Sequence, residues 1–279
     1  MFMDFSQGTS ELVTRDRNMI KVSINTLSTF REDWLLLEMS LPDLEVVSNY
    51  LETDRNQNGA PLAISIPDMH NMKASFDIFD RIKELNIPVP DKEQGYYRRM
   101  LLEAIVAAMQ AEVFFIHERG FESHQQYDQF WNEYYKDNCR YYSNLHRVQT
   151  NFTDYLEDQK RDCQLFSRQK HAHIEETEEN NWRIVASLRD SFHEMHTSCA
   201  VDPESSTVIK AYGKIHRAPD QVCFESSELL EQLAGMKFTP EYRKNLREKA
   251  AGPQGCAHFG DLVVDSAFLL AEVRDYKTV

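Results

Sequence analysis

Two cysteines stand where predicted helices begin. Cys223 follows the irregular stretch "RAPDQV", and Cys256 follows the irregular stretch "AGPQG". A segment with helical periodicity comes after each cysteine. A helix N-terminus carries partial positive charge and free backbone N–H groups. Both features lower the pKa of a thiol and favour the thiolate, which binds metals and attacks electrophiles. We therefore expect lowered pKa values for both thiols.

Two histidines and an aspartate accompany these cysteines. His193 opens a predicted strand three residues after Asp190, and His258 lies two positions after Cys256. Imidazole and thiolate ligands together suit Zn²⁺, iron or an iron–sulfur cluster. The sequence thus predicts a metal site formed by His193, Cys223, Cys256 and His258. Asp190 would orient His193 or complete the ligand set.

The competing interpretation treats these residues as ordinary structure. Each cysteine would be a small buried side chain and each histidine a surface residue. The sequence contains no Cys-x-x-Cys spacing that would argue against this. Cys139 and Cys163 lie in polar sequence of helical character and have no evident partner. We therefore expect Cys139→Ser to leave the metal content unchanged.

The C-terminal part of the chain has the pattern of an antiparallel meander. Three segments alternate apolar and polar residues and are joined by short polar connections; they are residues 182–188, 193–201 and 207–215. Three helices are predicted after them, at residues 223–235, 239–250 and 256–273. A strand start that carries His193 and two helix starts that carry cysteines can then meet at one end of the domain.

The N-terminal part favours helices. Residues 30–52 show helical periodicity, and residues 92–118 are rich in helix formers and apolar around their middle, which is typical of the centre of a helical bundle. One or two long helices are predicted over residues 123–166. The other segments are short strands at residues 20–27 and 62–66 and an irregular start at residues 1–19.

These elements define an α+β protein with two domains. Residues 1–165 are expected to form a mainly helical domain. Residues 166–279 are expected to form a domain of a three-stranded antiparallel meander and three helices, which would carry the metal site.

Residues 167–270 resemble an uncharacterised bacterial family, domain of unknown function 2889. The matching stretches are "NWRIVASLRDSFHEMHTSCAVD", "TVIKAYGKIHRAPDQVCFESSELLEQLAG" and "GCAHFGDLVVDSAF". The family shows a Trp-led strand, an Asp, a His-acidic-Met segment, an Arg-x-Pro…Cys segment and a final Gly-Cys-Thr-His-Leu. Here Ala257 and Phe259 replace the Thr and the Leu. The resemblance implies a shared site and no particular reaction.

The same region also resembles IscU/NifU-type scaffolds for iron–sulfur assembly. The likeness follows the order of a strand ending in Val-Asp, a Cys before a Ser-containing helix and a Cys that opens a late helix. In those scaffolds three Cys and an Asp cluster, whereas here Ser191 and His193 stand at approximately the positions of the first Cys and the Asp. The likeness implies that the loop ends carrying His193, Cys223 and Cys256 converge.

Composition narrows the class of protein. The chain has 279 residues, a hydrophobic fraction of 42% and a formal net charge of −14. An acidic chain lacks the basic face that nucleic-acid binding needs. No signal peptide and no stretch that could span a membrane are recognisable, and an odd number of cysteines argues against a disulfide framework. We expect a cytoplasmic protein with free thiols.

Two functions follow from these features. The first is a metal-binding protein that acts as a metalloenzyme or as a component of metal or cluster assembly, with iron or an iron–sulfur cluster as the cofactor and zinc as the alternative. The second is a helical adaptor that binds a protein partner through its N-terminal domain, with a purely structural metal or none. The aromatic stripe from Tyr127 to Tyr142 would serve as its interface or core.

Overall fold

The N-terminal part of the chain forms strands, so the expectation of a mainly helical N-terminal domain is wrong. The computed structural model describes residues 5–56, 60–74, 77–156 and 161–278. Its first elements are β1 (Phe5–Asp16), β2 (Met19–Ser28), β3 (Arg31–Ser40), β4 (Glu45–Asn56) and β5 (Leu62–Ile64). The short strands expected at residues 20–27 and 62–66 are confirmed. The helix expected over residues 30–52 and the irregular start are not found.

β3 shows the physical reason for this error. Alternate residues from Arg31 to Met39 are buried, which is the two-residue period of a strand. Between them, Trp34 and Leu36 remain 45% and 38% exposed, so both faces of the strand carry large apolar side chains. An apolar run of this kind fits a helical period as well as a strand period.

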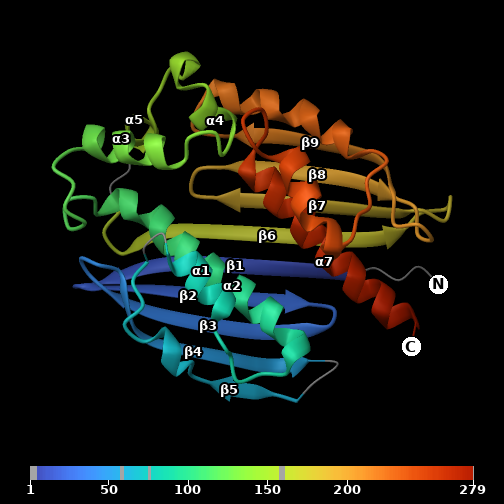
Figure 1. Cartoon of the computed structure of the whole chain (residues 1–279), viewed down its shortest axis with the longest axis horizontal. Helices are drawn as coiled ribbons and strands as arrows, with labels where there is room; N and C mark the ends of the chain where they lie inside the picture. The colour runs from blue at the N-terminus through green and yellow to red at the C-terminus, as the bar shows by residue number, and fades with distance from the viewer. Residues whose placement is uncertain (1–4, 57–59, 75–76, 157–160, 279) are drawn as a thin grey trace. The chain divides into compact units, whose positions relative to one another are not determined.

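All nine strands follow one another in a single sheet, in the order β5-β4-β3-β2-β1-β6-β7-β8-β9 (Figure 1). The later strands are β6 (Gln164–Glu176), β7 (Trp182–Asp190), β8 (Glu194–Val201) and β9 (Val208–Arg217). Neighbouring strands pair antiparallel, for example β2 with β3 and β7 with β8. The three C-terminal strands predicted from the sequence are confirmed, but they belong to a larger sheet and not to a separate three-stranded meander.

The helices lie between and after the two groups of strands. The α-helices are α1 (Ile78–Glu84), α2 (Asp91–Ala111), α3 (His124–Tyr134), α4 (Arg140–Ser143), α5 (Phe152–Leu156), α6 (Arg243–Ala250) and α7 (Ala257–Thr278). The 3₁₀ segments are η1 (Pro67–Met69), η2 (Glu112–Phe114), η3 (Leu145–Arg147), η4 (Gln221–Leu233) and η5 (Pro240–Tyr242). The strong helix predicted over residues 92–118 is α2, which packs on β2 and β3 and not in a bundle. The long helices predicted over residues 123–166 are short segments.

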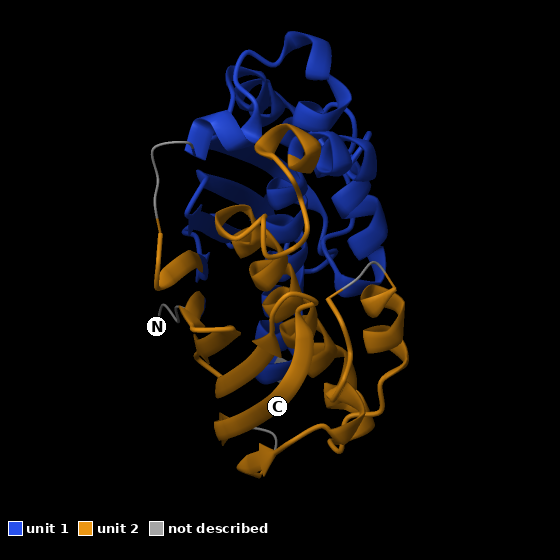
Figure 2. Ribbon diagram, turned by 90° about the vertical axis from the view of Figure 1, so that its left-hand side faces the viewer, with its two compact units in different colours: residues 1–8, 128–157, 170–279 blue, residues 9–127, 158–169 orange. Residues whose placement is uncertain are grey.

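Two compact units divide the chain (Figure 2). Unit 2 consists of Thr9–Tyr127 and Asp158–Gln169, and unit 1 of Met1–Gly8, Asp128–Glu157 and Lys170–Val279. Within unit 1, α7 packs against β7 and β8, and η4 packs along β9. This arrangement brings the starts of η4 and α7 into the same unit as the connection between β7 and β8.

A buried polar network occupies the core of unit 2. Arg31 donates through Nε to Asp33 Oδ2 at 2.6 Å, and through Nη2 to Asp33 Oδ1 at 3.1 Å and to the Tyr97 hydroxyl at 2.9 Å. The hydroxyl groups of Thr53 and Tyr96 donate to Asp33 at 2.6 and 2.8 Å. Burial acts to lower the pKa of Arg31, but the hydrogen bond to Asp33 and the neighbouring charges raise it above its ordinary value. Arg31 therefore remains charged inside the protein.

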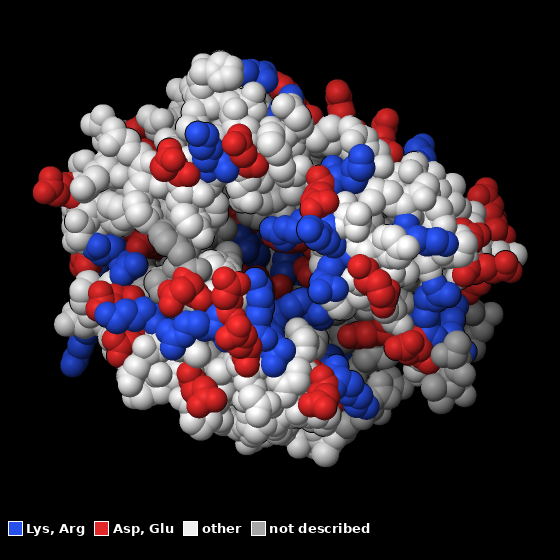
Figure 3. Space-filling view, in the orientation of Figure 1, with Lys and Arg blue, Asp and Glu red and all other residues white. Residues whose placement is uncertain are grey.

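The surface carries charges of both signs. On the face drawn in Figure 3, acidic and basic side chains lie next to one another. In the part of the chain that the structure describes, no helix combines the length and the apolar composition needed to cross a bilayer. The expectation that the protein binds no nucleic acid stays a prediction, as does the expected protein partner.

Candidate functional site

Three of the predicted site residues come together in unit 1. One ligand atom from each of Asp190, His193 and His258 lies within 4.8 Å of the other two. Asp190 ends β7, His193 immediately precedes β8, and His258 lies in the first turn of α7. The imidazole rings of His193 and His258 have their centroids 4.1 Å apart. The connection between β7 and β8 therefore meets the start of α7, as the sequence analysis expected for His193 and His258.

Asp190 holds the connection between the two strands in place. Its Oδ1 atom accepts hydrogen bonds from the backbone N–H groups of Phe192 at 2.7 Å and His193 at 2.6 Å, and lies 3.2 Å from His193 Nδ1. Arg217 of β9 donates to the carbonyl oxygens of Ser191 at 2.9 Å and His193 at 3.1 Å. A carboxylate on Nδ1 orients the ring and leaves Nε2 as the metal-binding atom. This geometry favours Asp190 as the residue that positions His193.

The position of Asp190 leads to a prediction. Asp190→Asn keeps an oxygen that accepts from the two backbone N–H groups but weakens the interaction with Nδ1 of His193. For the metal site expected from the sequence, the affinity should fall by about 10–100-fold, the usual cost of losing such a partner. Chelator competition measures this, with His193→Ala as the reference for complete loss of a ligand. A loss as large as that of His193→Ala would mean that Asp190 binds the metal directly.

Cys256 lies next to this group. Its Sγ atom is 3.9 Å from Nδ1 of His258. A sulfur and a nitrogen bound to one tetrahedral zinc ion lie roughly 3.6 Å apart, because Zn–S and Zn–N bonds are about 2.3 and 2.0 Å long. Cys256 and His258 are therefore close to the separation that a shared ion requires. The segment before α7 is fixed by a hydrogen bond of 3.0 Å from Cys256 N to the carbonyl oxygen of Ala250.

Cys223 lies in the first turn of η4, which is a 3₁₀ helix and not the predicted α-helix. Asp220 caps this helix, because its Oδ1 atom accepts from Val222 N at 2.9 Å. Among the described residues, neither Cys223 nor Cys256 belongs to the group of ligand atoms within 4.8 Å. The charge of Cys223 does act on the pKa of Cys256, so these two cysteines lie near each other.

The expected lowering of the thiol pKa values does not occur. Burial raises the pKa of Cys223 to about 12, and the charge of a neighbouring thiol at Cys139 acts in the same direction. Burial likewise raises the pKa of Cys256. Backbone N–H groups at both helix starts do favour the thiolate, as predicted, but loss of hydration outweighs them. Both thiols are therefore protonated at neutral pH without a metal, and metal binding would release protons.

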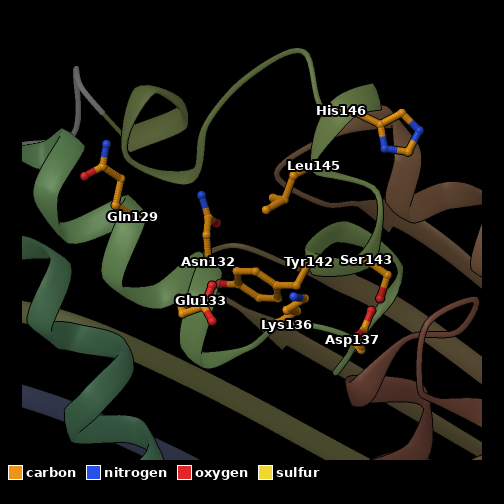
Figure 4. Close-up of a pocket in the computed structure, with 9 residues that line it drawn as sticks. All are labelled: Gln129, Asn132, Glu133, Lys136, Asp137, Tyr142, Ser143, Leu145 and His146. Carbon is orange, nitrogen blue, oxygen red and sulfur yellow. The ribbon is translucent and has the colours of Figure 1, made fainter.

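A separate hollow of about 390 Å³ lies beside α3 and α4 (Figure 4). Its lining is largely polar and includes Glu133, Lys136, Tyr142 and His146. Burial raises the pKa of Tyr142 well above its ordinary value, with a further contribution from Cys139. None of the residues predicted from the sequence to bind a metal lines this hollow.

Comparison with known proteins gives a family match for one segment of the chain. Residues 166–270 match the model of the family described as "Protein of unknown function (DUF2889)". The DUF2889 segment covers less than half of the chain and contains all five predicted site residues. No curated protein and no solved structure matches the chain, so the likeness to IscU/NifU-type scaffolds receives no support. The DUF2889 description names no activity, so it adds no function to the geometry of the site.

Proposed function

We propose that the protein binds a transition metal through His193 and His258, with thiolates from Cys256 and Cys223 and with Asp190 positioning His193. The observation that carries the proposal is the convergence of Asp190, His193 and His258 from separate elements to within 4.8 Å. Nitrogen and sulfur ligands together suit zinc, iron or an iron–sulfur cluster better than Mg²⁺ or Ca²⁺. The site would serve a metalloenzyme or a component of metal or cluster assembly.

The test is the metal content of the full chain purified without oxygen and then offered Zn²⁺, or Fe²⁺ with sulfide. Wild type should hold about one ion or one cluster per chain after desalting. His193→Ala and Cys256→Ser should each remove most of it, because each deletes a ligand. The matched controls are His70→Ala and Cys163→Ser, which change exposed residues of unit 2.

Two results would contradict the proposal. One is a wild-type protein that retains no metal from either solution. The other is full retention in both His193→Ala and Cys256→Ser. A colourless zinc site with four protein ligands, by contrast, would leave metal binding intact but favour a structural role, because a catalytic zinc keeps one position open for water or substrate.

A further inference from the structure

Two histidines on neighbouring strands of unit 1 form a pair outside the proposed metal site. Nδ1 of His196 in β8 and Nε2 of His216 in β9 lie 2.9 Å apart, which is the distance of a hydrogen bond that one ring donates to the other. The two rings are nearly parallel, with an interplanar angle of 24° and centroids 5.0 Å apart. His216 is exposed and His196 is partly exposed. The pair is therefore accessible to an ion from solution.

The pairing of β8 with β9 explains how the two rings meet. Met195 pairs with Ile215, and Glu194 pairs with Arg217. β9 therefore has one extra residue between these two pairs, and that residue is His216. A β-bulge of this kind bends its strand and redirects the side chain, and bulges are frequent next to functional sites. The backbone thus directs the imidazole of His216 towards β8.

The separation of the two nitrogens suits the binding of one metal ion. Two nitrogens at adjacent corners of a square-planar or tetragonal ion lie about 2.8 Å apart, because metal–nitrogen bonds of about 2.0 Å meet there at about 90°. On a tetrahedral ion the same two nitrogens would be about 3.3 Å apart. The distance of 2.9 Å between His196 Nδ1 and His216 Nε2 therefore favours Cu²⁺ or Ni²⁺ over a tetrahedral zinc ion.

Protonation of the rings agrees with this. Burial lowers the pKa of His196, and the charges of His216 and Lys214 act in the same direction, so the imidazole of His196 is neutral at pH 7. A neutral imidazole has one N–H group and one nitrogen with a free electron pair. For both facing nitrogens to bind an ion, the ring that donates the hydrogen bond holds its proton on its other nitrogen instead. This is a change of tautomer, so no proton is released.

We propose that His196 and His216 form a second metal site, which binds Cu²⁺ or Ni²⁺ with water in the remaining positions. Imidazole suits both ions, and Cu²⁺ has the highest affinity of the divalent first-row metals. The second site shares no residue with the one at His193 and His258 and does not depend on the function proposed above. Lys214 lies directly opposite His196 across the two strands, and its positive charge should weaken the binding of a cation there.

The test is the titration of the full chain with Ni²⁺, followed by calorimetry. His196→Ala and His216→Ala should each weaken one Ni²⁺ site by about 100-fold or more, because the second imidazole binds an ion that the first already holds nearby. His70→Ala, which removes an exposed histidine of unit 2, is the matched control and should bind Ni²⁺ as wild type does. Far-ultraviolet circular dichroism checks that each variant is folded.

Two further variants make the test specific. Lys214→Gln should raise the Ni²⁺ affinity of this site by about two- to fivefold, because it removes a positive charge at the protein surface. His193→Ala should leave this site intact, whatever it does to the site proposed above. Unchanged Ni²⁺ binding in both His196→Ala and His216→Ala would overturn the inference and leave the proposed function standing. Loss of Ni²⁺ binding in His193→Ala alone would likewise overturn it.

Discussion

Replacing Asp33 with alanine should lower the free energy of unfolding by about 3–5 kcal/mol, because it removes the carboxylate closest to the buried guanidinium of Arg31 and leaves only Glu93, 3.7 Å away, as a counter-charge. The side chain of Asp33 is fully buried and accepts hydrogen bonds from Arg31, Thr53 and Tyr96. Alanine would remove the acceptor for all of these groups at once. Denaturant unfolding followed by tryptophan fluorescence gives the difference.

Asp43→Ala is the matched control for this prediction. Asp43 also forms an ion pair, with Lys73 at 2.6 Å, but the two side chains are 55% and 50% exposed. Water screens such a pair, and the substitution should leave stability within the error of the measurement. A loss below about 1 kcal/mol in Asp33→Ala would contradict the view that Arg31 is charged and shielded from solvent.

The second large effect is expected for Gly255→Ala. A Cβ atom at this position would lie 2.6 Å from the carbonyl oxygen of Ala251 and closer still to that of Ala250. The oxygen of Ala250 accepts the hydrogen bond from Cys256 N, and the oxygen of Gly255 accepts the one from Arg140 N. Backbone atoms cannot turn aside as a side chain can. We expect a loss of about 2–3 kcal/mol in stability, and weaker metal binding at the proposed site as Cys256 moves.

Gly95→Ala provides the comparison. Gly95 lies exposed inside α2, and nothing approaches the position of its Cβ within 4 Å. Alanine should therefore stabilise the protein there by about 0.5–1 kcal/mol, through its higher helix propensity. Thermal unfolding of the two variants, with chelator competition for the first, tests the pair. Equal stability of Gly255→Ala and wild type would show that the segment before α7 can shift without cost.

β7 and β8 could be predicted because the residues on one face of each strand are largely apolar and buried. In β7, the residues from Trp182 to Leu188 alternate between buried and solvent-facing positions, and Arg183 and Arg189 lie on the outer side. The N-terminal strands lack this contrast. Leu27, Trp34 and Leu36 lie on the outer side of β2 and β3 and are more than a third exposed. The alternation that marks a strand is therefore hidden in their sequence.

The site could be predicted only where its residues are close in the sequence or directly follow an irregular stretch containing Pro or Gly before a predicted helix. Cys256 and His258 share one helix start, and His193 follows Asp190 in one connection between strands. Arg140, by contrast, contacts Gln254 across 114 residues of sequence. No periodicity or local spacing encodes such a contact. The pKa values of the thiols were predicted in the wrong direction for a related reason, because burial is a property of the folded chain.

The discontinuous make-up of unit 1 has a consequence for the order in which the chain folds during synthesis. Unit 2 possesses all of its residues once Gln169 has been added. Unit 1 begins with the first residues of the chain, yet Phe5 packs edge-to-face on Tyr276, with ring centroids 5.9 Å apart, near the end of α7. α7 is synthesised after all the other described elements, and it supplies both the aromatic partner of Phe5 in β1 and the residue His258, directly after Cys256. The proposed metal site therefore cannot be complete until unit 2 has all of its residues and α7 has been added.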